Sequence, residues 1–240
     1  MDILTRTDDL AKRSDNKNII TYTNFLTPAE QSMILTKNYK NMVLNGGGSF
    51  TERKRAFFLP SYLEDVNVAD YIVALKISYS YKPLTHRDFL GTLMGLNIKR
   101  ECIGDIYVFE KEAYVYVVKE MADFIKQNVQ KVGSVGVKIE EIDLKDVKMP
   151  EVKTEKIKFT VSSVRLDSIV AHSFKVSREA AVDAIKEGIV ALDYLECVTP
   201  SKEISEKNIV SFRGHGKVKV VKIGDKSQRG RTFIEVEKYI

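Results

Sequence analysis

Basic side chains in the last third of the chain have the types and spacing needed to hold phosphate groups. They are Arg165, Arg178, Lys186, Arg213 and Lys217. Arginine and lysine bind phosphate through charge-assisted hydrogen bonds, and arginine does so with a planar fork of donors. None of those on the expected helices has a carboxylate at i+4 on its own helix to neutralise it. If their segments pack together, we expect the five cations to converge on one surface that attracts an anionic partner.

Two short helices and two strands must position these side chains. Apolar residues at helical spacing predict an amphipathic helix over residues 165–174. Ser177 is the expected N-cap of a second helix, and Gly188 lies where a left-handed residue would end it. Residues 189–192 and 209–212 are expected strands, and the second leads into a tight Gly-His-Gly turn.

This order of parts, over about residues 157–223, resembles the S4-type (αL-motif) RNA-binding domain, which is also found in pseudouridine synthases and tyrosyl-tRNA synthetases. Alone, Arg-Leu-Asp or Arg-Gly-x-Gly-Lys would indicate only a helix start or a polar hairpin. The resemblance implies RNA contacts by Arg165, Ser177, Arg178, Lys186, Arg213 and Lys217. Asp193 departs from the asparagine often found after the second strand, which leaves a base contact there without support.

The composition is that of an ordinary globular protein with a basic C-terminal third. Of its 240 residues, 44% are hydrophobic and 30% are charged, and the formal net charge is +5. Residues 158–240 hold 15 Lys/Arg and 11 Asp/Glu, so they carry +4 of that charge. Cys102 and Cys197 are isolated, which argues against a disulfide scaffold or a zinc site and favours a reducing cytoplasm. No apolar run could cross a bilayer and the N-terminus lacks a signal-peptide core, so we expect no membrane partner.

Residues 1–70 are expected to form a small N-terminal α/β domain. Helical patterns cover residues 3–13 and a segment that begins at Thr27, where a proline follows the N-cap. Residues 42–44 and 56–59 are expected strands.

A triple glycine, Gly46-Gly47-Gly48, lies between these two strands. It could cradle a phosphate, but no Gly-Lys-Ser/Thr follows it, so we expect a flexible hairpin loop instead. Arg53 and Arg55 come directly after the loop and are interpreted either as a solvated strand edge or as phosphate contacts.

Residues 71–143 show the βαββαβ order of a ferredoxin-like plait, which RNA-recognition domains also use. Strands are expected at residues 71–77, 103–109, 113–118 and 135–142, and helices at 85–96 and 119–132. Aromatic residues of the central hairpin either stack on bases or pack in a core, and both interpretations remain open: Tyr107, Phe109, Tyr114 and Tyr116.

The segment Thr85-His86-Arg87-Asp88 suggests acid–base chemistry. Consecutive residues of a helix point in different directions, however, so His86 and Asp88 could not both face one substrate. We therefore expect Thr85 to cap the helix and no residue to be catalytic. The nearby basic residues are expected to be solvated or to face phosphate: His86, Arg87, Lys99 and Arg100.

These expectations define an α+β chain in four parts. Residues 1–70 and 71–143 precede a linker at 144–157, which is dense in charge and contains one proline, and the S4-type domain covers 158–240.

Over about residues 25–222 the arrangement is similar to the YlmH family of bacterial RNA-binding proteins, some of which are labelled cell-division proteins. The shared motifs are Gly-Gly followed by Glu-Arg-Lys-Arg-Ala, Thr-His-Arg-Asp-Phe-Leu-Gly with Lys-Arg-Glu and Gly-Asp, and the C-terminal domain. The resemblance implies cytoplasmic binding to rRNA and peptidyl-tRNA on the large ribosomal subunit, in the rescue of stalled subunits, where the protein would assist template-free alanine tailing.

We expect a monomer that uses no cofactor, metal or small-molecule substrate. Two other functions compete with this expectation: an RNA-modifying enzyme or its accessory, and a regulatory binder of messenger RNA or cell-division proteins.

Overall fold

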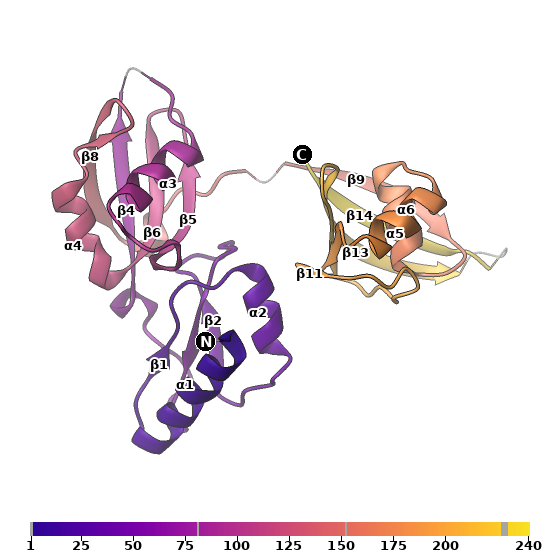
Figure 1. Ribbon diagram of the computed structural model, residues 1–240, viewed down its shortest axis with the longest axis horizontal. Coiled ribbons are helices and arrows are strands. Elements are labelled where there is room, and N and C mark those ends of the chain that lie inside the picture. The colour runs from indigo at the N-terminus through magenta and orange to yellow at the C-terminus, as the bar shows by residue number, and fades with distance from the viewer. Residues whose placement is uncertain (1, 81, 152, 227–229) are drawn as a thin grey trace. The chain divides into compact units, whose positions relative to one another are not determined.

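The chain folds into two compact units, Met1–Pro150 and Glu151–Ile240 (Figure 1). The computed structural model describes residues 2–80, 82–151, 153–226 and 230–240. The boundary falls inside the predicted linker 144–157, of which residue 152 lies outside the described residues. A 3₁₀ turn occupies Leu144–Asp146 and a strand begins at Thr154, so the part without regular structure is shorter than predicted.

The first unit begins with two helices and a three-stranded sheet. The elements are α1 (Ile3–Lys17), β1 (Thr21–Tyr22), α2 (Pro28–Leu35), β2 (Met42–Asn45) and β3 (Arg55–Phe58), and the antiparallel sheet has the order β1-β3-β2. The expected cap is confirmed, because the Thr27 hydroxyl accepts a hydrogen bond from the Glu30 amide while the Glu30 carboxylate accepts one from the Thr27 amide. Helix α1 extends beyond the predicted end at residue 13.

The glycine segment between β2 and β3 is packed rather than free, which corrects the expectation of a flexible loop. Gly47 has a φ of +91°, and a Cβ on it would lie 3.0 Å from the ring of Tyr116. A Cβ on Gly48 would lie 2.5 Å from the Tyr116 hydroxyl. Glycine is needed here because the backbone rests directly on that ring.

A five-stranded antiparallel sheet follows in the same unit. Its strands are β4 (Ile72–Tyr79), β5 (Ile103–Val108), β6 (Glu112–Val118), β7 (Lys131–Val132) and β8 (Val135–Ile142), in the order β5-β6-β4-β8-β7. The helices are α3 (His86–Gly95) and α4 (Lys119–Asn128), and 3₁₀ turns lie at Val68–Asp70 and Arg100–Cys102. The four predicted strands and the two helices are present, but the helix predicted over residues 119–132 ends at Asn128, and the last two residues of that range form the short strand β7.

Both faces of this sheet are covered within the unit. Phe89 of α3 and Ile125 of α4 pack in a buried cluster with Leu75 on one face. On the other face, Tyr114 and Tyr116 pack in a second cluster with N-terminal residues that include Phe25, Phe57 and Leu59. Tyr114 and Tyr116 are only 2% and 1% exposed, so they are core residues and cannot stack on bases.

The second unit is a six-stranded antiparallel sheet with two helices. Its elements are β9 (Thr154–Val161), α5 (Leu166–Phe174), α6 (Arg178–Lys186), β10 (Val190–Leu192), β11 (Leu195–Glu196), β12 (Ile209–Phe212), β13 (Gly216–Lys226) and β14 (Thr232–Tyr239). The strand order is β11-β10-β12-β13-β14-β9.

Helices α5 and α6 pack together on one face of this sheet (Figure 1). Leu166, Ile169 and Ile185 are fully buried against Val218 and Val236. The predicted helix pair and the strands β10 and β12 are confirmed. The long strands β9, β13 and β14, which complete the sheet, were not expected from the sequence.

Across the described part of the chain, the structure contains no helix that is both long and apolar enough to cross a membrane.

Candidate nucleic-acid interface

A buried carboxylate joins the starts of the two helices in the second unit. Asp167 is 1% exposed, and its Oδ2 accepts hydrogen bonds from Arg165 Nη2 at 3.1 Å and from Arg178 Nη2 at 3.2 Å and Nε at 3.3 Å. Its Oδ1 accepts from the Ser168 amide at 2.8 Å. Neither arginine has a carboxylate at i+4 on its own helix, as the sequence indicated, but the two share this carboxylate from the start of α5.

The two arginines still present cationic surface. Their side chains are 36% and 60% exposed, and one carboxylate between two guanidinium groups leaves a net charge of +1. Both lie beside the first turn of α6, where backbone amides also favour anions. Ser177 positions this end by capping: its Oγ accepts a hydrogen bond from the Ala180 amide at 3.0 Å, as predicted.

The turn between β12 and β13 carries a second group of cations. The exposed Arg213 donates its amide to the Ile189 carbonyl at 3.1 Å, which fixes the turn to the segment after α6. Gly214 and Gly216 have φ values of +83° and +107°, and only glycine adopts these without strain. The ring of His215 stacks on Phe212 with 4.1 Å between centroids.

Lys217, after this turn, lies against aromatic rings. Its ammonium group is 4.5 Å from the ring centroid of Tyr239 and 5.6 Å from that of Tyr194. Cation–π contacts of this kind orient a lysine while leaving it charged.

A groove of about 480 Å³ lies between this turn and the end of α6. Arg213 and Glu196 both line it. Gly188 ends the helix with a φ of +72°, as predicted, and a Cβ on it would lie 2.6 Å from Glu196 Oε1. The groove therefore combines one cation with one carboxylate.

The six predicted contact residues form two groups instead of one surface. Lys186 is the last residue of α6 and Arg178 is the first. Eight residues of helical rise separate them by about 12 Å. Arg165, Ser177 and Arg178 are thus grouped at the start of α6. Lys186 lies at the other end, which the turn that carries Arg213 and leads to Lys217 adjoins. The convergence expected from the sequence is therefore incomplete.

The Asp193 carboxylate has a structural role that could not be predicted from the sequence. Its backbone is left-handed, with a φ of +48°, and its carboxylate accepts hydrogen bonds from the Ile209 amide at 2.8 Å and from Asn208 Nδ2 at 2.6 Å. The carboxylate thereby holds the start of β12 against the turn that follows β10.

In the first unit, the structure separates the basic residues that were interpreted as phosphate contacts. Arg55 is 1% exposed, donates to the carbonyls of Thr23 and Tyr71, and lies 4.6 Å from the ring of Tyr22. Both interpretations of Arg55, as a solvated edge or as a phosphate contact, are wrong. Its burial lowers its pKa from the ordinary value.

Arg53 and Arg100 are half-buried and donate to backbone carbonyls, whereas His86, Arg87 and Lys99 are exposed. Although the side chain of His86 reaches the surface, partial loss of solvent around its ring and the nearby charge of Arg100 lower its pKa, while Asp105 opposes the effect.

The segment Thr85-His86-Arg87-Asp88 is a helix cap, as expected. The Asp88 carboxylate accepts hydrogen bonds from the Thr85 amide and hydroxyl, both at 2.7 Å. The hydrogen bond from the Thr85 hydroxyl lowers the pKa of Asp88 most, and the bond from the Thr85 amide lowers it further. Among the described residues, no group of three or more His, Cys, Asp or Glu side chains could hold a metal ion.

Three comparisons with known proteins agree with this arrangement. A family model described as a putative RNA-binding domain in YlmH matches residues 67–146. The ribosome-associated protein quality control protein P2 of Bacillus subtilis (strain 168) is 32% identical over 221 residues, which cover 90% of this chain and 86% of that protein. The solved structure of the cell division protein YlmH from Streptococcus pneumoniae covers 60% of this chain and 91% of its own, with a TM-score of 0.52 and 22% identity, which indicates a shared fold. The chain belongs to the YlmH family.

Proposed function

We propose that this chain is a non-catalytic RNA-binding protein that associates with the large ribosomal subunit and contacts rRNA and peptidyl-tRNA during the rescue of stalled nascent chains. The Bacillus subtilis relative is named as a ribosome-associated quality control protein, and it matches nearly the whole chain. The observation that carries the proposal is the arginine pair held by Asp167 at the start of α6, which presents fixed guanidinium groups to an anion.

Selectivity in this proposal comes from RNA shape, with phosphate contacts providing the affinity. Of the four aromatic residues considered for stacking on bases, Tyr114 and Tyr116 are core residues, and the half-buried Tyr107 and Phe109 pack against the same cluster. Guanidinium and ammonium groups at the two ends of α6 would instead contact the backbone of a structured RNA.

The fold supports assigning two RNA-binding modules. The β4–β8 region has βαββαβ order with neighbours β5-β6-β4-β8, which we assign to the ferredoxin-like plait. We assign the second unit to the S4-type domain, since two packed helices precede the strand and glycine turn that carry Arg213. The proposed partition at 1–70, 71–143, 144–157 and 158–240 places the family match at 67–146 almost wholly in the second part. The protein would act in the cytoplasm as a monomer.

Co-sedimentation of the full chain with purified large subunits tests the proposal. About five phosphate contacts give a log–log slope of binding against salt of roughly −4. We expect the protein to travel with the large subunit at low salt and to leave it along this slope. Migration with neither subunit, or retention that does not change with salt, would contradict the proposal.

A further inference from the structure

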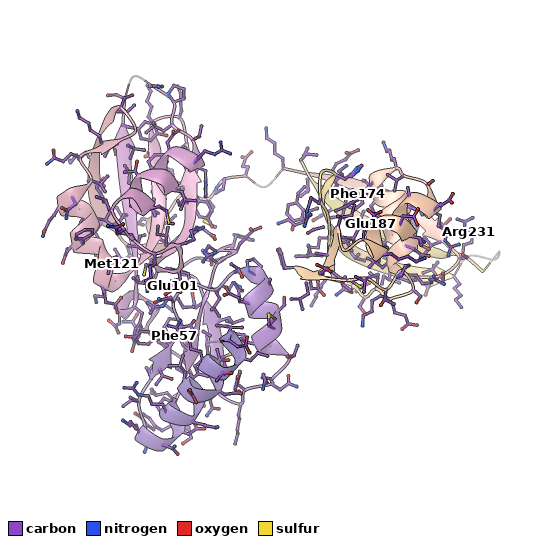
Figure 2. All side chains as sticks on the ribbon, in the orientation of Figure 1. Phe57, Glu101, Met121, Phe174, Glu187 and Arg231 are labelled. Atoms are coloured by element: carbon purple, nitrogen blue, oxygen red, sulfur yellow. The ribbon has the colours of Figure 1, made fainter. Side chains whose placement is uncertain are left out.

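A polar pocket of about 310 Å³ lies in the first unit, where α1 and the start of α2 meet the segment that leads into β5. In Figure 2, the labelled Phe57 and Glu101 mark the region in which the N-terminal elements meet the five-stranded sheet. Four cations line the pocket together with two carboxylates: Arg6, Arg53, Lys99, Arg100, Glu30 and Glu101.

Two of the cations are held side by side by one backbone oxygen. Arg53 Nε donates to the Ile103 carbonyl at 3.2 Å, and Arg100 Nη1 donates to the same oxygen at 2.5 Å. The two nitrogens are therefore less than about 6 Å apart, a distance at which like charges repel even with solvent screening. Arg53 Nη2 also donates to the Phe25 carbonyl at 3.0 Å, so the pair is fixed in place.

The carboxylates of the pocket make no direct contact with this pair. Glu30 Oε2 accepts from the amide and hydroxyl of Thr27, and Glu101 Oε1 accepts from Asn24 Nδ2 at 2.9 Å. Within the described ranges, neither Arg53 nor Arg100 has a carboxylate oxygen within 4.0 Å.

The electrostatic surroundings support the same conclusion. Burial lowers the pKa of both guanidinium groups, and the charge of Arg53 lowers that of Arg100 further. In the opposite direction, Glu30 and Asp105 raise the pKa of Arg53, and Asp105 raises that of Arg100. A cationic pair that is already partly desolvated and lacks a contacting anion is an arrangement that an anionic ligand would stabilise.

We infer that this pocket binds a phosphate group. The hydrogen bonds of the pair use Nε and Nη2 of Arg53 and only Nη1 of Arg100, which donates to the Ile103 and Gly104 carbonyls, and an arginine carries five N–H donors. The remaining donors lie in the planes of the two guanidinium groups, a geometry that suits the oxygens of phosphate. Arg6 and Lys99 add two more cations at the same pocket. The inference goes beyond the proposed ribosomal function, because a free phosphate needs no ribosome in order to bind.

The test uses inorganic phosphate and the isotopically labelled full chain. We expect saturable shifts of the amide resonances of Arg53, Arg100 and Ile103 in NMR titrations, and no such shifts with chloride at equal ionic strength. Arg6→Gln with Lys99→Gln removes two cations whose side chains make no hydrogen bond among the described residues, so the fold should be retained. Loss of two partly exposed charge contacts should weaken phosphate binding about five- to tenfold.

Lys131→Gln with Lys138→Gln is the matched control, because it makes the same change in charge on exposed residues of β7 and β8, at the opposite edge of the sheet from β5. This control should bind phosphate as the wild type does. Absence of saturable shifts at the three amides, or equal weakening in the two double variants, would overturn the inference.

A second titration identifies the source of the phosphate. A single-stranded RNA hexamer that displaces inorganic phosphate from these amides would assign the pocket to the RNA backbone, whereas free phosphate binding that persists with RNA present would assign it to a small phosphate compound. Either result supports a phosphate pocket. Co-sedimentation of the pocket variant with large subunits separates this inference from the proposed function, since a variant that loses phosphate but keeps the subunit leaves that function intact.

Discussion

Asp167→Asn should destabilise the second unit by about 2–3 kcal/mol. The substitution keeps the shape of the side chain but removes the charge that holds Arg165 and Arg178. The asparagine oxygen can still accept from the Ser168 amide, while its NH₂ group would face both guanidinium groups, with which it can form no favourable contact.

The magnitude follows from the exposure of the three partners. Removing one member of a buried ion pair typically costs about 3–5 kcal/mol, because the other charge is left without a partner in the interior. Here the carboxylate is 1% exposed, but Arg165 and Arg178 are 36% and 60% exposed and can turn toward water. Because water can solvate both guanidinium groups, the expected loss of stability is smaller than the cost of breaking a fully buried ion pair.

Hydrogen exchange measured across a urea series by mass spectrometry reads each unit separately. Peptides from α5 and α6 should lose protection at lower urea in the variant, and peptides from β4 and β6 should not change. Asp183→Asn, an exposed acid on α6, is the control and should shift stability by less than about 0.5 kcal/mol. A shift this small for Asp167→Asn as well would refute the view that the carboxylate holds the helix starts together.

Three further outcomes are expected. Arg213→Ala should leave stability within about 0.5 kcal/mol, since its side chain is exposed, and weaken rRNA binding by about 1.5–3 kcal/mol; filter binding that showed an equal loss for exposed Lys222→Ala would contradict the assignment. Burial raises the pKa of Asp105 above 3.8, so its native state holds the proton more tightly and stability is lost as pH rises from 3.8 through the raised pKa. Urea midpoints of the wild type should therefore fall relative to Asp105→Asn over this window, and parallel curves would argue against it. Residues 151–240 alone should melt cooperatively and residues 158–240 at a lower temperature, because the shorter piece lacks the first half of the β9–β14 pairing; equal melting temperatures in circular dichroism would show that this half contributes nothing.

Local features of the fold were predictable from the sequence because local chemistry determines them. Thr27, Thr85 and Ser177 each cap the helix that their spacing indicated. Gly188 ends α6 in the left-handed conformation for the same reason. In each case the hydroxyl or the glycine acts within four residues of its own position.

Long-range contacts were not predictable in this way. Asp167 lies two residues from Arg165, so a rule based on i+4 spacing overlooked it, and its bond to Arg178 depends on how two helices pack. Strand alternation correctly placed Tyr114 and Tyr116 in a strand but could not show which face is covered. Strand β13 could have been found, because valine alternates with lysine from Lys217 to Val220.

N-terminal side chains pack on the face of the five-stranded sheet that carries Tyr114 and Tyr116. This packing means that the recognised family domain and the unit that folds have different boundaries. The recognised domain spans residues 67–146, yet Phe25, Phe57 and Leu59, which pack on that face, lie outside it. If residues 67–146 were excised, Ile72, Ala74, Tyr114, Tyr116 and Val118 would be exposed as one apolar patch, the kind of surface that drives association. In this chain the first seventy residues therefore shield the apolar face of the sheet from water. The smallest piece expected to remain soluble is the whole first unit.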